Sequence, residues 1–341
     1  MKLKSPLGVT IKITNACNLN CDHCIAGSGT KSEKEISLDG WKSIINDLRE
    51  NDVFFIDFTG GEPLIRDDWQ IIARYAKSFG FLISLTTNAT LIDAKVAKTI
   101  SEIGFSTVRV SLDGSSSVVN NQQRKGQIDA FTKAIEGIKY LRLAGVPITV
   151  ISTISKRNFH DMDGIMQLLT ELGVDAVNFF PFVPDGRGEK LKEISFLHID
   201  MINFYKKVEE LKAEYSDRID FLVNSPLFNV WQKQYGGENN SSKKYFCLAG
   251  KQMLYISEDG EVMPCPMFKK SIGNITHQNL ASIWNEYSYL NDLINADKLA
   301  NTCKECDEVD LCFGGCRAAA LKVNGSISTV DPFCWVQYDK T

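Results

Sequence analysis

The chain of 341 residues lacks cysteine from residue 25 to residue 246, although it contains ten cysteines in all. It also lacks a long apolar run; the longest are of strand length, so we expect no transmembrane helix. The first 14 residues, MKLKSPLGVTIKIT, are interrupted by Lys12 and contain no continuous apolar segment typical of a signal peptide. No basic block occurs and the net charge is -4, which disfavours a nucleic-acid surface. These absences predict a cytoplasmic protein with no membrane and no nucleic-acid partner.

The cysteines that are present fall into two groups near the two ends of the chain. Three lie at 17–24 and seven lie at 247–334. Because the cytoplasm keeps thiols reduced, such groups indicate ligands of a metal or a cluster, whereas a secreted protein would use them as a disulfide scaffold. Hydrophobic residues make up 44% of the chain, and its length suits one large domain with a smaller one.

The first half of the chain alternates strand-like and helix-like segments. The strand-like segments are nearly apolar, as buried parallel strands are, and comprise 7–14, 53–59, 81–87, 107–112, 146–152 and 176–182. The first helical segment opens at Ser37, and the later ones run to glycines, as helix ends often do: Gly80, Gly104, Gly145 and Gly173. This alternation predicts an α/β fold with a parallel sheet, either a barrel or an open doubly wound sheet. Both bind ligands at the carboxyl ends of strands, where the first cysteines lie.

The alternation ends near residue 188. A long amphipathic helix is expected at about 195–215, a strand near 219–224 and a polar loop or boundary at 234–244. A hairpin turning at Asp259 and Gly260 follows within the cysteine-rich region. We therefore expect three parts: a core domain at 1–188, a bridging helix and strand region at 189–240, and a cysteine-rich domain at 241–341.

The first cysteine group is the stretch CNLNCDHC, in which Cys17, Cys21 and Cys24 are spaced C-x3-C-x2-C. A structural zinc site would need a fourth ligand, and His23 is awkwardly placed beside Cys24, although a catalytic zinc with an open position is conceivable. Iron–sulfur clusters are usually held by four thiolates. Three cysteines would leave one iron free for a substrate or cofactor.

A second motif, FTGGEP at 58–63, directly follows the second strand-like segment. Glycine lets a backbone approach a ligand closely, and the Glu62 carboxylate can accept hydrogen bonds from an ammonium group. Taken alone, the motif favours a plain glycine turn that carries a surface glutamate.

Together, CNLNCDHC and FTGGEP resemble the signature motifs of radical S-adenosylmethionine (SAM) enzymes. The resemblance implies a partial (β/α)6 TIM-like barrel in which Cys17, Cys21 and Cys24 hold a [4Fe–4S] cluster. It places His23 at the aromatic position of the loop. It also implies that the amino and carboxylate groups of SAM chelate the fourth iron. The residues expected to grip the methionyl amino group are Gly60, Gly61 and Glu62.

Two weaker segments fit the same family. TTNA at 86–89 is similar to a Thr-Asn-Gly segment, with Ala89 in place of glycine, and SLDG at 111–114 precedes Arg124. The resemblance implies that Asn88, Ser111 and Arg124 contact SAM. Where many relatives carry a His-Asp pair this chain reads SSSVVNNQQ, so a solvated Arg124 and a turn role for Asn88 stay open.

The C-terminal cysteines resemble the SPASM extension of radical SAM enzymes, which carries two auxiliary [4Fe–4S] clusters. By that resemblance, the outer cluster is held by Cys303, Cys306, Cys312 and Cys334. The inner cluster is held by Cys247, Cys265 and Cys316. Some relatives have an eighth cysteine just before the first, but this chain has ENNSSKKYF there. Substrate or water is therefore expected as the fourth ligand of the inner cluster.

Catalytic acid or base residues are not assigned by the sequence. Asp57 and Asp113 lie near expected strand ends and are candidate bases. Similar sulfatase-maturing enzymes place an aspartate after the second SPASM cysteine, where this chain has Pro266, so that activity is in doubt. The segment FFPFVP at 179–184 is expected either to line the adenine side or to pack in the core.

The resemblance implies three [4Fe–4S] clusters, SAM and an external one-electron donor of the flavodoxin or ferredoxin type. Reductive cleavage of SAM would yield a 5'-deoxyadenosyl radical that abstracts a substrate hydrogen. The auxiliary clusters would then accept an electron, giving a crosslink or dehydrogenation in a peptide or protein.

Two alternatives remain open. The first is a dehydrogenase, epimerase or decarboxylase acting on a sugar, aminoglycoside or nucleoside. One feature supports it: the first strand is expected to begin near residue 7, which leaves no room for an N-terminal peptide-binding domain. The second is a non-enzymatic iron–sulfur electron carrier, which would not need the GGEP motif.

Overall fold

A computed structural model describes residues 3–236 and 247–336. Its centre is one curved sheet of ten strands in the order β10-β9-β8-β1-β2-β3-β4-β5-β6-β7. The strands from β1 to β7 are all parallel to their neighbours. Their bounds are β1 Gly8–Lys12, β2 Phe55–Thr59, β3 Leu82–Thr87, β4 Thr107–Ser111, β5 Ile148–Ile154, β6 Ala176–Pro181 and β7 Asp220–Phe221. The predicted α/β barrel fold and its six principal strands are therefore confirmed.

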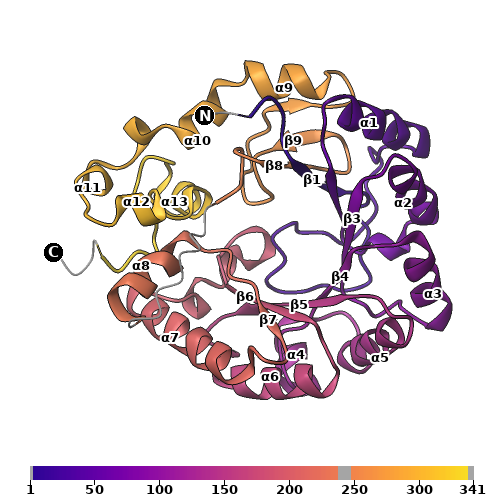
Figure 1. The fold of residues 1–341 in the computed structure, drawn as a ribbon, viewed down its shortest axis with the longest axis horizontal. Helices are drawn as coiled ribbons and strands as arrows, with labels where there is room; N and C mark the ends of the chain where they lie inside the picture. Colours follow the sequence, from indigo (N-terminus) through magenta and orange to yellow (C-terminus); the bar gives the residue numbers. More distant parts are fainter. Residues whose placement is uncertain (1–2, 237–246, 337–341) are drawn as a thin grey trace.

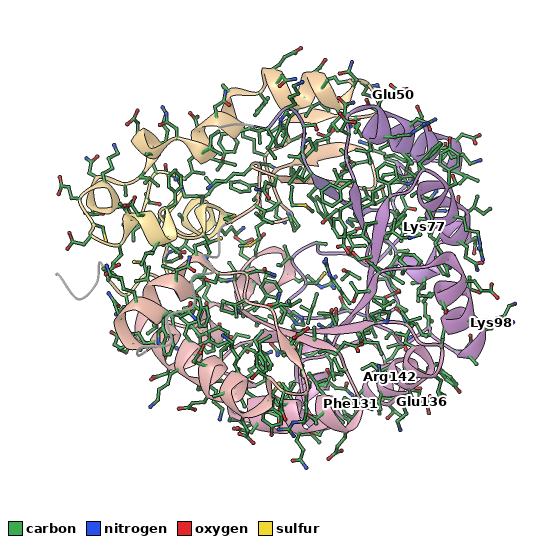
Figure 2. The ribbon with its side chains drawn as sticks, in the orientation of Figure 1. Glu50, Lys77, Lys98, Phe131, Glu136 and Arg142 are labelled. Atoms are coloured by element: carbon green, nitrogen blue, oxygen red, sulfur yellow. The ribbon has the colours of Figure 1, made fainter. Side chains whose placement is uncertain are left out.

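Helices cover the outside of this sheet, as Figure 1 shows. They are α1 Leu38–Glu50, α2 Trp69–Ser78, α3 Ala94–Ile103, α4 Ser117–Gln123, α5 Ala130–Leu143, α6 Met162–Glu171, α7 His198–Tyr215 and α8 Pro226–Tyr235. Short 3-10 turns occur at η1 Pro63–Ile65, η2 Phe159–Asp161, η3 Gly186–Lys190, η4 Lys192–Ile194 and η5 Ala296–Lys298. The labelled side chains of Lys98 and Glu136 project outward from the helices, away from the sheet (Figure 2).

Local sequence explains how α1 forms. Ser37 caps the helix by accepting the backbone N–H of Gly40 at 3.2 Å. Its buried residues recur at helical spacing, so one face packs on the sheet: Trp41, Ile44, Ile45 and Leu48. Gly104 ends α3 in the left-handed conformation with φ 81°, as the sequence predicts. The helix α4 was not predicted, because its polar sequence SVVNNQQ carries no apolar periodicity.

The C-terminal segments continue the same sheet. Strand β8 (Met253–Ile256) pairs parallel with β1, and β9 (Glu261–Met263) returns antiparallel to β8, which confirms the predicted hairpin. The remaining elements are β10 Gly273–Asn274, α9 Leu280–Glu286, α10 Ser288–Ile294, α11 Asn301–Lys304, α12 Val309–Cys312 and α13 Arg317–Asn324. The sheet thus crosses the expected boundary at residue 241, and most of the predicted loop at 234–244 lies outside the described residues.

Two further predictions are corrected in extent. The strand expected at 219–224 is only the two-residue β7, while the helix expected at 195–215 runs from His198 to Tyr215. Among the described residues, no helix is both long enough and apolar enough to cross a membrane.

Candidate active site

The first cysteine group forms a loop directly after β1. Cys17, Cys21 and Cys24 pack together with Leu19 and Ala130 in one small buried cluster. Burial raises the pKa of Cys17 to about 11, although the N–H of Leu19 opposes the shift. Negative charge on Cys21 or Cys24 would raise it further. The loop therefore brings its thiols together.

The GGEP segment lies against the backbone of this cysteine loop. The N–H of Gly61 donates to the carbonyl of Thr14 at 2.8 Å, and the N–H of Glu62 donates to the carbonyl of Ala16 at 2.8 Å. A Cβ on Gly61 would lie only 2.3 Å from that Ala16 oxygen. The second glycine is thus required by the close approach of two backbones.

The carboxylate of Glu62 is completely buried, so the surface-glutamate alternative is wrong. One oxygen accepts the Thr87 hydroxyl at 2.7 Å and the other accepts the N–H of Asn88 at 2.8 Å. Burial raises the pKa of Glu62 from 4.5 to about 7, and these hydrogen bonds oppose the rise. Within the described ranges no cation forms an ion pair with this carboxylate, so its chemistry fits the amino group of a ligand such as SAM.

Asn88 ties the end of β3 to the cysteine loop. Its amide Nδ2 donates to Oδ1 of Asn18 at 2.9 Å, and its Oδ1 accepts the Thr90 hydroxyl at 2.6 Å. Ala89 has φ 59°, the left-handed conformation that favours the glycine of the similar family segment. The turn alternative for Asn88 is thus present in the structure, beside the loop that it supports.

Arg124 and His23 meet at one buried carboxylate. Nε of Arg124 lies 2.8 Å from Oδ2 of Asp113, and Nε2 of His23 lies 3.2 Å from the same atom. Arg124 is only 9% exposed, so the solvated alternative is wrong. Burial lowers the pKa of His23 to about 4, although Asp113 opposes the shift. Ser111, the last residue of β4, is half-buried.

The two candidate bases are already engaged by protein groups. Asp113 also accepts the N–H of Thr153 at 2.8 Å, besides its contacts with Arg124 and His23. Asp57 lies in the middle of β2 rather than at its end, and it accepts the Ser84 hydroxyl and pairs with Arg109 at 3.2 Å. Both carboxylates hold strands together, because the interior of the barrel needs its polar groups satisfied.

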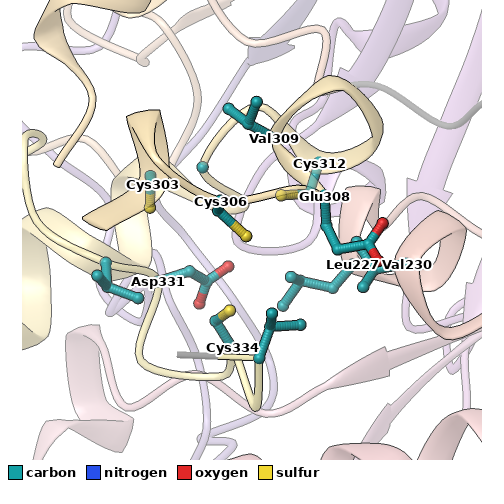
Figure 3. Close-up of a pocket in the computed structure, with 12 residues that line it drawn as sticks. Leu227, Val230, Cys303, Cys306, Glu308, Val309, Cys312, Asp331 and Cys334 are labelled. Atoms are coloured by element: carbon teal, nitrogen blue, oxygen red, sulfur yellow. The ribbon is translucent and has the colours of Figure 1, made fainter. Parts of the chain in front are cut away.

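Four C-terminal cysteines line one pocket, shown in Figure 3: Cys303, Cys306, Cys312 and Cys334. Burial raises the pKa of Cys312 to about 12, and the other three thiols add to the shift. Asp331 lies in the same pocket wall and accepts the backbone N–H of Cys316 at 2.6 Å. The structure thus brings together the four cysteines expected to hold the outer cluster. The hydrogen bond of Asp331 connects the wall of this pocket to Cys316, which belongs to the inner set.

The remaining three cysteines, Cys247, Cys265 and Cys316, line an adjoining pocket, and Cys312 of the first set also reaches its wall. Burial raises the pKa of Cys265 to about 12, and Cys247 adds to the shift. The residues just before Cys247, where relatives have an eighth cysteine, lie outside the described residues. This set fits the inner cluster expected from the sequence.

A single metal ion fits the described residues less well. They contain no group of three or more His, Cys, Asp or Glu side chains set for one ion. The zinc alternative for CNLNCDHC therefore has no support in this part of the chain.

Sequence reasoning missed a clamp on the cysteine loop. Nε of Arg187 donates to the carbonyl of Cys21 at 2.8 Å, and its backbone N–H donates to the carbonyl of Cys24 at 3.0 Å. Gly186 has φ 58°, and a Cβ there would lie 2.3 Å from the Ile25 oxygen. The charged run DGRG after an apolar strand was its only sequence signal.

The neighbouring Asp185 is also completely buried. Its oxygens lie 3.1 Å from Nζ of Lys322 in α13 and 3.4 Å from Nζ of Lys269, which follows the hairpin. The segment that clamps the first cysteine loop is thus joined by charge to the C-terminal cysteine-rich region.

Comparison with known sequences agrees with this site. A model of the Radical SAM superfamily matches residues 11–169, and a model of the SPASM iron-sulfur cluster-binding domain matches residues 247–307. AdoMet-dependent heme synthase from Methanosarcina barkeri is 30% identical over 97% of this chain and 96% of its own length. Mycofactocin maturase MftC from Mycolicibacterium smegmatis is 28% identical over 97% of this chain and 83% of its own.

Solved structures show the same fold at lower identity. His-tagged anSMEcpe with bound AdoMet superposes with a TM-score of 0.78 at 21% identity, covering 98% of this chain and 95% of that one. Streptococcus suis SuiB bound to its precursor peptide superposes with a TM-score of 0.78 at 18% identity, covering 98% and 77%.

These relatives, read with the two cysteine-rich sites and the buried Glu62, leave the electron-carrier alternative without support. The cofactors are SAM and [4Fe–4S] clusters, including auxiliary clusters of the C-terminal domain. The chain therefore belongs to the radical SAM superfamily, as an enzyme that carries a C-terminal SPASM iron–sulfur domain.

Proposed function

We propose that this enzyme oxidatively modifies an apolar side chain of a peptide or protein, by forming a crosslink or a double bond. The observation that carries the proposal is an apolar cavity of about 230 Å³ beside the three inner cysteines. Its walls come from β6, α7, β7 and α8 on one side and from the cysteine-rich domain on the other. Phe179 and Phe180 of the segment FFPFVP line it.

Residues of the first site have distinct parts in this proposal. The group that Cys17, Cys21 and Cys24 would hold supplies, with SAM, reductive cleavage to a 5'-deoxyadenosyl radical that abstracts hydrogen. Glu62 accepts the N–H groups of the methionyl amine, because it is a buried carboxylate without a cation of its own. Arg187 holds the loop carbonyls in place, and the surrounding burial excludes water from the reacting centre.

The chemistry of the cavity favours a peptide side chain. Its lining includes no Lys or Arg among the described residues, and most of it is aromatic or aliphatic. A Phe, Leu or Val side chain would bury its apolar surface there at no cost in charge. Mycofactocin maturase and PqqA peptide cyclase, the latter 26% identical over 96% of this chain, support a peptide substrate.

A second candidate is a small tetrapyrrole, because of two relatives from Methanosarcina barkeri. AdoMet-dependent heme synthase is 30% identical, and Fe-coproporphyrin III synthase is 31% identical over 98% of this chain. The carboxylates of such a substrate would meet no positive charge in the described lining of the cavity. An unpaired charge in an apolar site is costly, which favours the peptide.

Deuterium transfer distinguishes these substrates. The reconstituted enzyme is incubated with SAM, dithionite and either a peptide pool deuterated at Phe, Tyr, Leu and Val or a coproporphyrin deuterated on its side chains. We expect deuterium in 5'-deoxyadenosine from the peptides only. Transfer from the coproporphyrin and none from the peptides would overturn the proposal.

The cofactor count and the electron donor complete the proposal. We infer three [4Fe–4S] clusters, reduced by a flavodoxin or ferredoxin. Replacement of Cys17, Cys21 and Cys24 by alanine should remove about one third of the iron and sulfide, since each cluster is held independently. A larger loss would show that the sites do not assemble independently, and no loss would remove the first site from the assignment.

A further inference from the structure

Two basic side chains lie in the wall of the inner cysteine pocket. Arg317 and Lys251 line it together with Cys247, Cys265 and Cys316. Arg317 directly follows the last of these cysteines and is only 6% exposed, which is unusual for a charged group. A positive charge held at this depth normally has a negative partner.

The guanidinium of Arg317 is only partly satisfied by protein. Its Nε donates to the carbonyl of Ile327, and Nη2 donates to the carbonyl of Lys298 at 2.8 Å. Its third nitrogen, Nη1, is buried and has no hydrogen-bond partner among the described residues. Two nitrogens therefore fix the orientation of the group, while the N–H groups of Nη1 have no partner.

Lys251 is a second cation, and no acidic side chain among the described residues forms an ion pair with it. Its Nζ lies 4.4 Å from the centre of the Phe313 ring. Both cations line the pocket of the inner cysteines, and neither lines the pocket of the four outer cysteines. Their positive charge is therefore placed closer to the inner site.

We propose that Arg317 donates its free Nη1 to the inner auxiliary cluster, and that Arg317 and Lys251 together make this site the more easily reduced of the two. The inference rests on the auxiliary clusters in the proposed function and adds the order in which they accept an electron. Positive charge and hydrogen bonds to sulfur both favour the reduced state. The sequence also assigns three cysteine ligands to the inner site and four to the outer site, so the inner cluster would carry less negative charge.

The test is a redox titration of the auxiliary clusters followed by electron paramagnetic resonance. The full chain is reconstituted with Cys17, Cys21 and Cys24 replaced by alanine, which leaves only the auxiliary signals. A further Cys334→Ala change assigns the outer signal, because it removes one of that site's ligands. Midpoint potentials of both signals are then compared among variants.

Each variant has its own expected pattern. Lys251→Met lowers the midpoint potential of the inner site alone. The expected shift is about 59 mV for one electron, which corresponds to a tenfold fall in the equilibrium constant for reduction. Arg317→Gln lowers both potentials, the inner one more. Arg317→Lys restores most of the outer value, because it keeps the charge, but less of the inner value, because it lacks the forked donors.

Lys270→Met is the matched control. Lys270 is exposed, lies over an aromatic ring like Lys251, with Nζ 5.2 Å from the centre of Tyr289, and does not line the pocket. We expect it to shift neither potential. The inference would be overturned if neither Lys251→Met nor Arg317→Gln changed the midpoint potentials. It would also be overturned if, in the unaltered chain, the inner site were harder to reduce than the outer site.

The outcomes separate this inference from the proposed function. Shifted potentials in an enzyme that transfers no deuterium from peptides would leave the inference standing and reject the substrate. Arg317→Gln removes two structural hydrogen bonds and can prevent assembly. Lys251→Met breaks none that the structure shows, so it decides the matter alone in that case.

Discussion

The carboxylate of Glu62 accepts the backbone N–H of Asn88 at 2.8 Å, at the point where β2 and β3 end. The bond joins the GGEP segment to the TTNA segment, and the Asn88 amide continues the connection to Asn18 in the cysteine loop. Three segments that are separate in the chain thereby form one support around a buried acid. The charge state of that acid controls what the site can bind.

SAM binding should depend on the protonation of Glu62. Because burial raises its pKa to about 7, the free site is largely protonated near pH 6, and binding of the methionyl amine favours the carboxylate. We expect proton release on SAM binding, measured by calorimetry in two buffers of different ionisation enthalpy. In Glu62→Gln the release should vanish and affinity should fall about 10- to 100-fold, since charged hydrogen bonds contribute about 1.5–3 kcal/mol. Equal proton release in the variant would contradict the assignment.

The same acid affects the stability of the SAM-free protein. Its folded pKa, about 7, lies above its ordinary value of 4.5, so its stabilising contribution is complete below pH 4.5 and is lost as the pH rises through about 7. The unfolding temperature of Glu62→Gln should therefore vary less with pH across that range than the unfolding temperature of the unaltered protein. Thermal unfolding measured at several pH values checks this, and parallel curves for both proteins would contradict it.

Gly61→Ala should disrupt the first cysteine site. The new Cβ would lie 2.3 Å from the Ala16 carbonyl oxygen, so the backbone that leads into the cysteine loop must move. We expect loss of iron and of the first cluster's signal after reduction, with the auxiliary signals unchanged. Gly29→Ala is the control, because Gly29 lies in the same loop region and a Cβ there meets nothing within 4 Å. Full cluster content in Gly61→Ala would show that the loop tolerates the shift.

Arg124→Gln should destabilise the core domain. It leaves the buried Asp113 without the guanidinium that lies 2.8 Å away, and breaking a buried ion pair costs about 3–5 kcal/mol. A lower unfolding temperature of the cluster-loaded protein measures the loss. Arg142→Gln, which breaks an exposed pair with Asp175 at 3.4 Å, should leave the unfolding temperature nearly unchanged. If both variants lowered the unfolding temperature by similar amounts, the buried pair would stabilise the fold no more than the exposed pair does.

Asp185→Asn should loosen the junction between the barrel and the cysteine-rich domain. The change keeps the volume of the side chain but removes the charge that faces Lys322 and Lys269. Hydrogen exchange in the 182–190 segment should then accelerate about tenfold, which corresponds to about 1.4 kcal/mol of local opening. Asp163→Asn, at an exposed pair with Lys207, is the control and should not change exchange there. If the exchange rate in Asp185→Asn did not change, the ion pairs of Asp185 would not be what stabilises the junction.

Much of the fold followed from local pattern. The apolar segments became the expected strands, Ser37 caps α1, and the glycines lie at or just beyond the helix ends. The sequence did not predict the polar helix α4, because its residues show no apolar periodicity. The ion pairs of Asp57 and Asp113 were not predicted for a different reason: their cationic partners come from other strands and loops, and no spacing reveals them.

The sequence by itself determined the family motifs and the cysteine sets, because spacing within a loop depends only on near neighbours. It also determined the order of strands and helices, since that order follows from apolar periodicity. Only the tertiary structure decided that Glu62 is buried without a cation among the described residues and that Asp185 pairs with lysines of the cysteine-rich region. It also decided that Arg317 lines the inner cysteine pocket and keeps a buried Nη1 without a hydrogen-bond partner in the described part of the chain. Burial and pairing arise between residues far apart in the chain, so they exist only once the chain has folded.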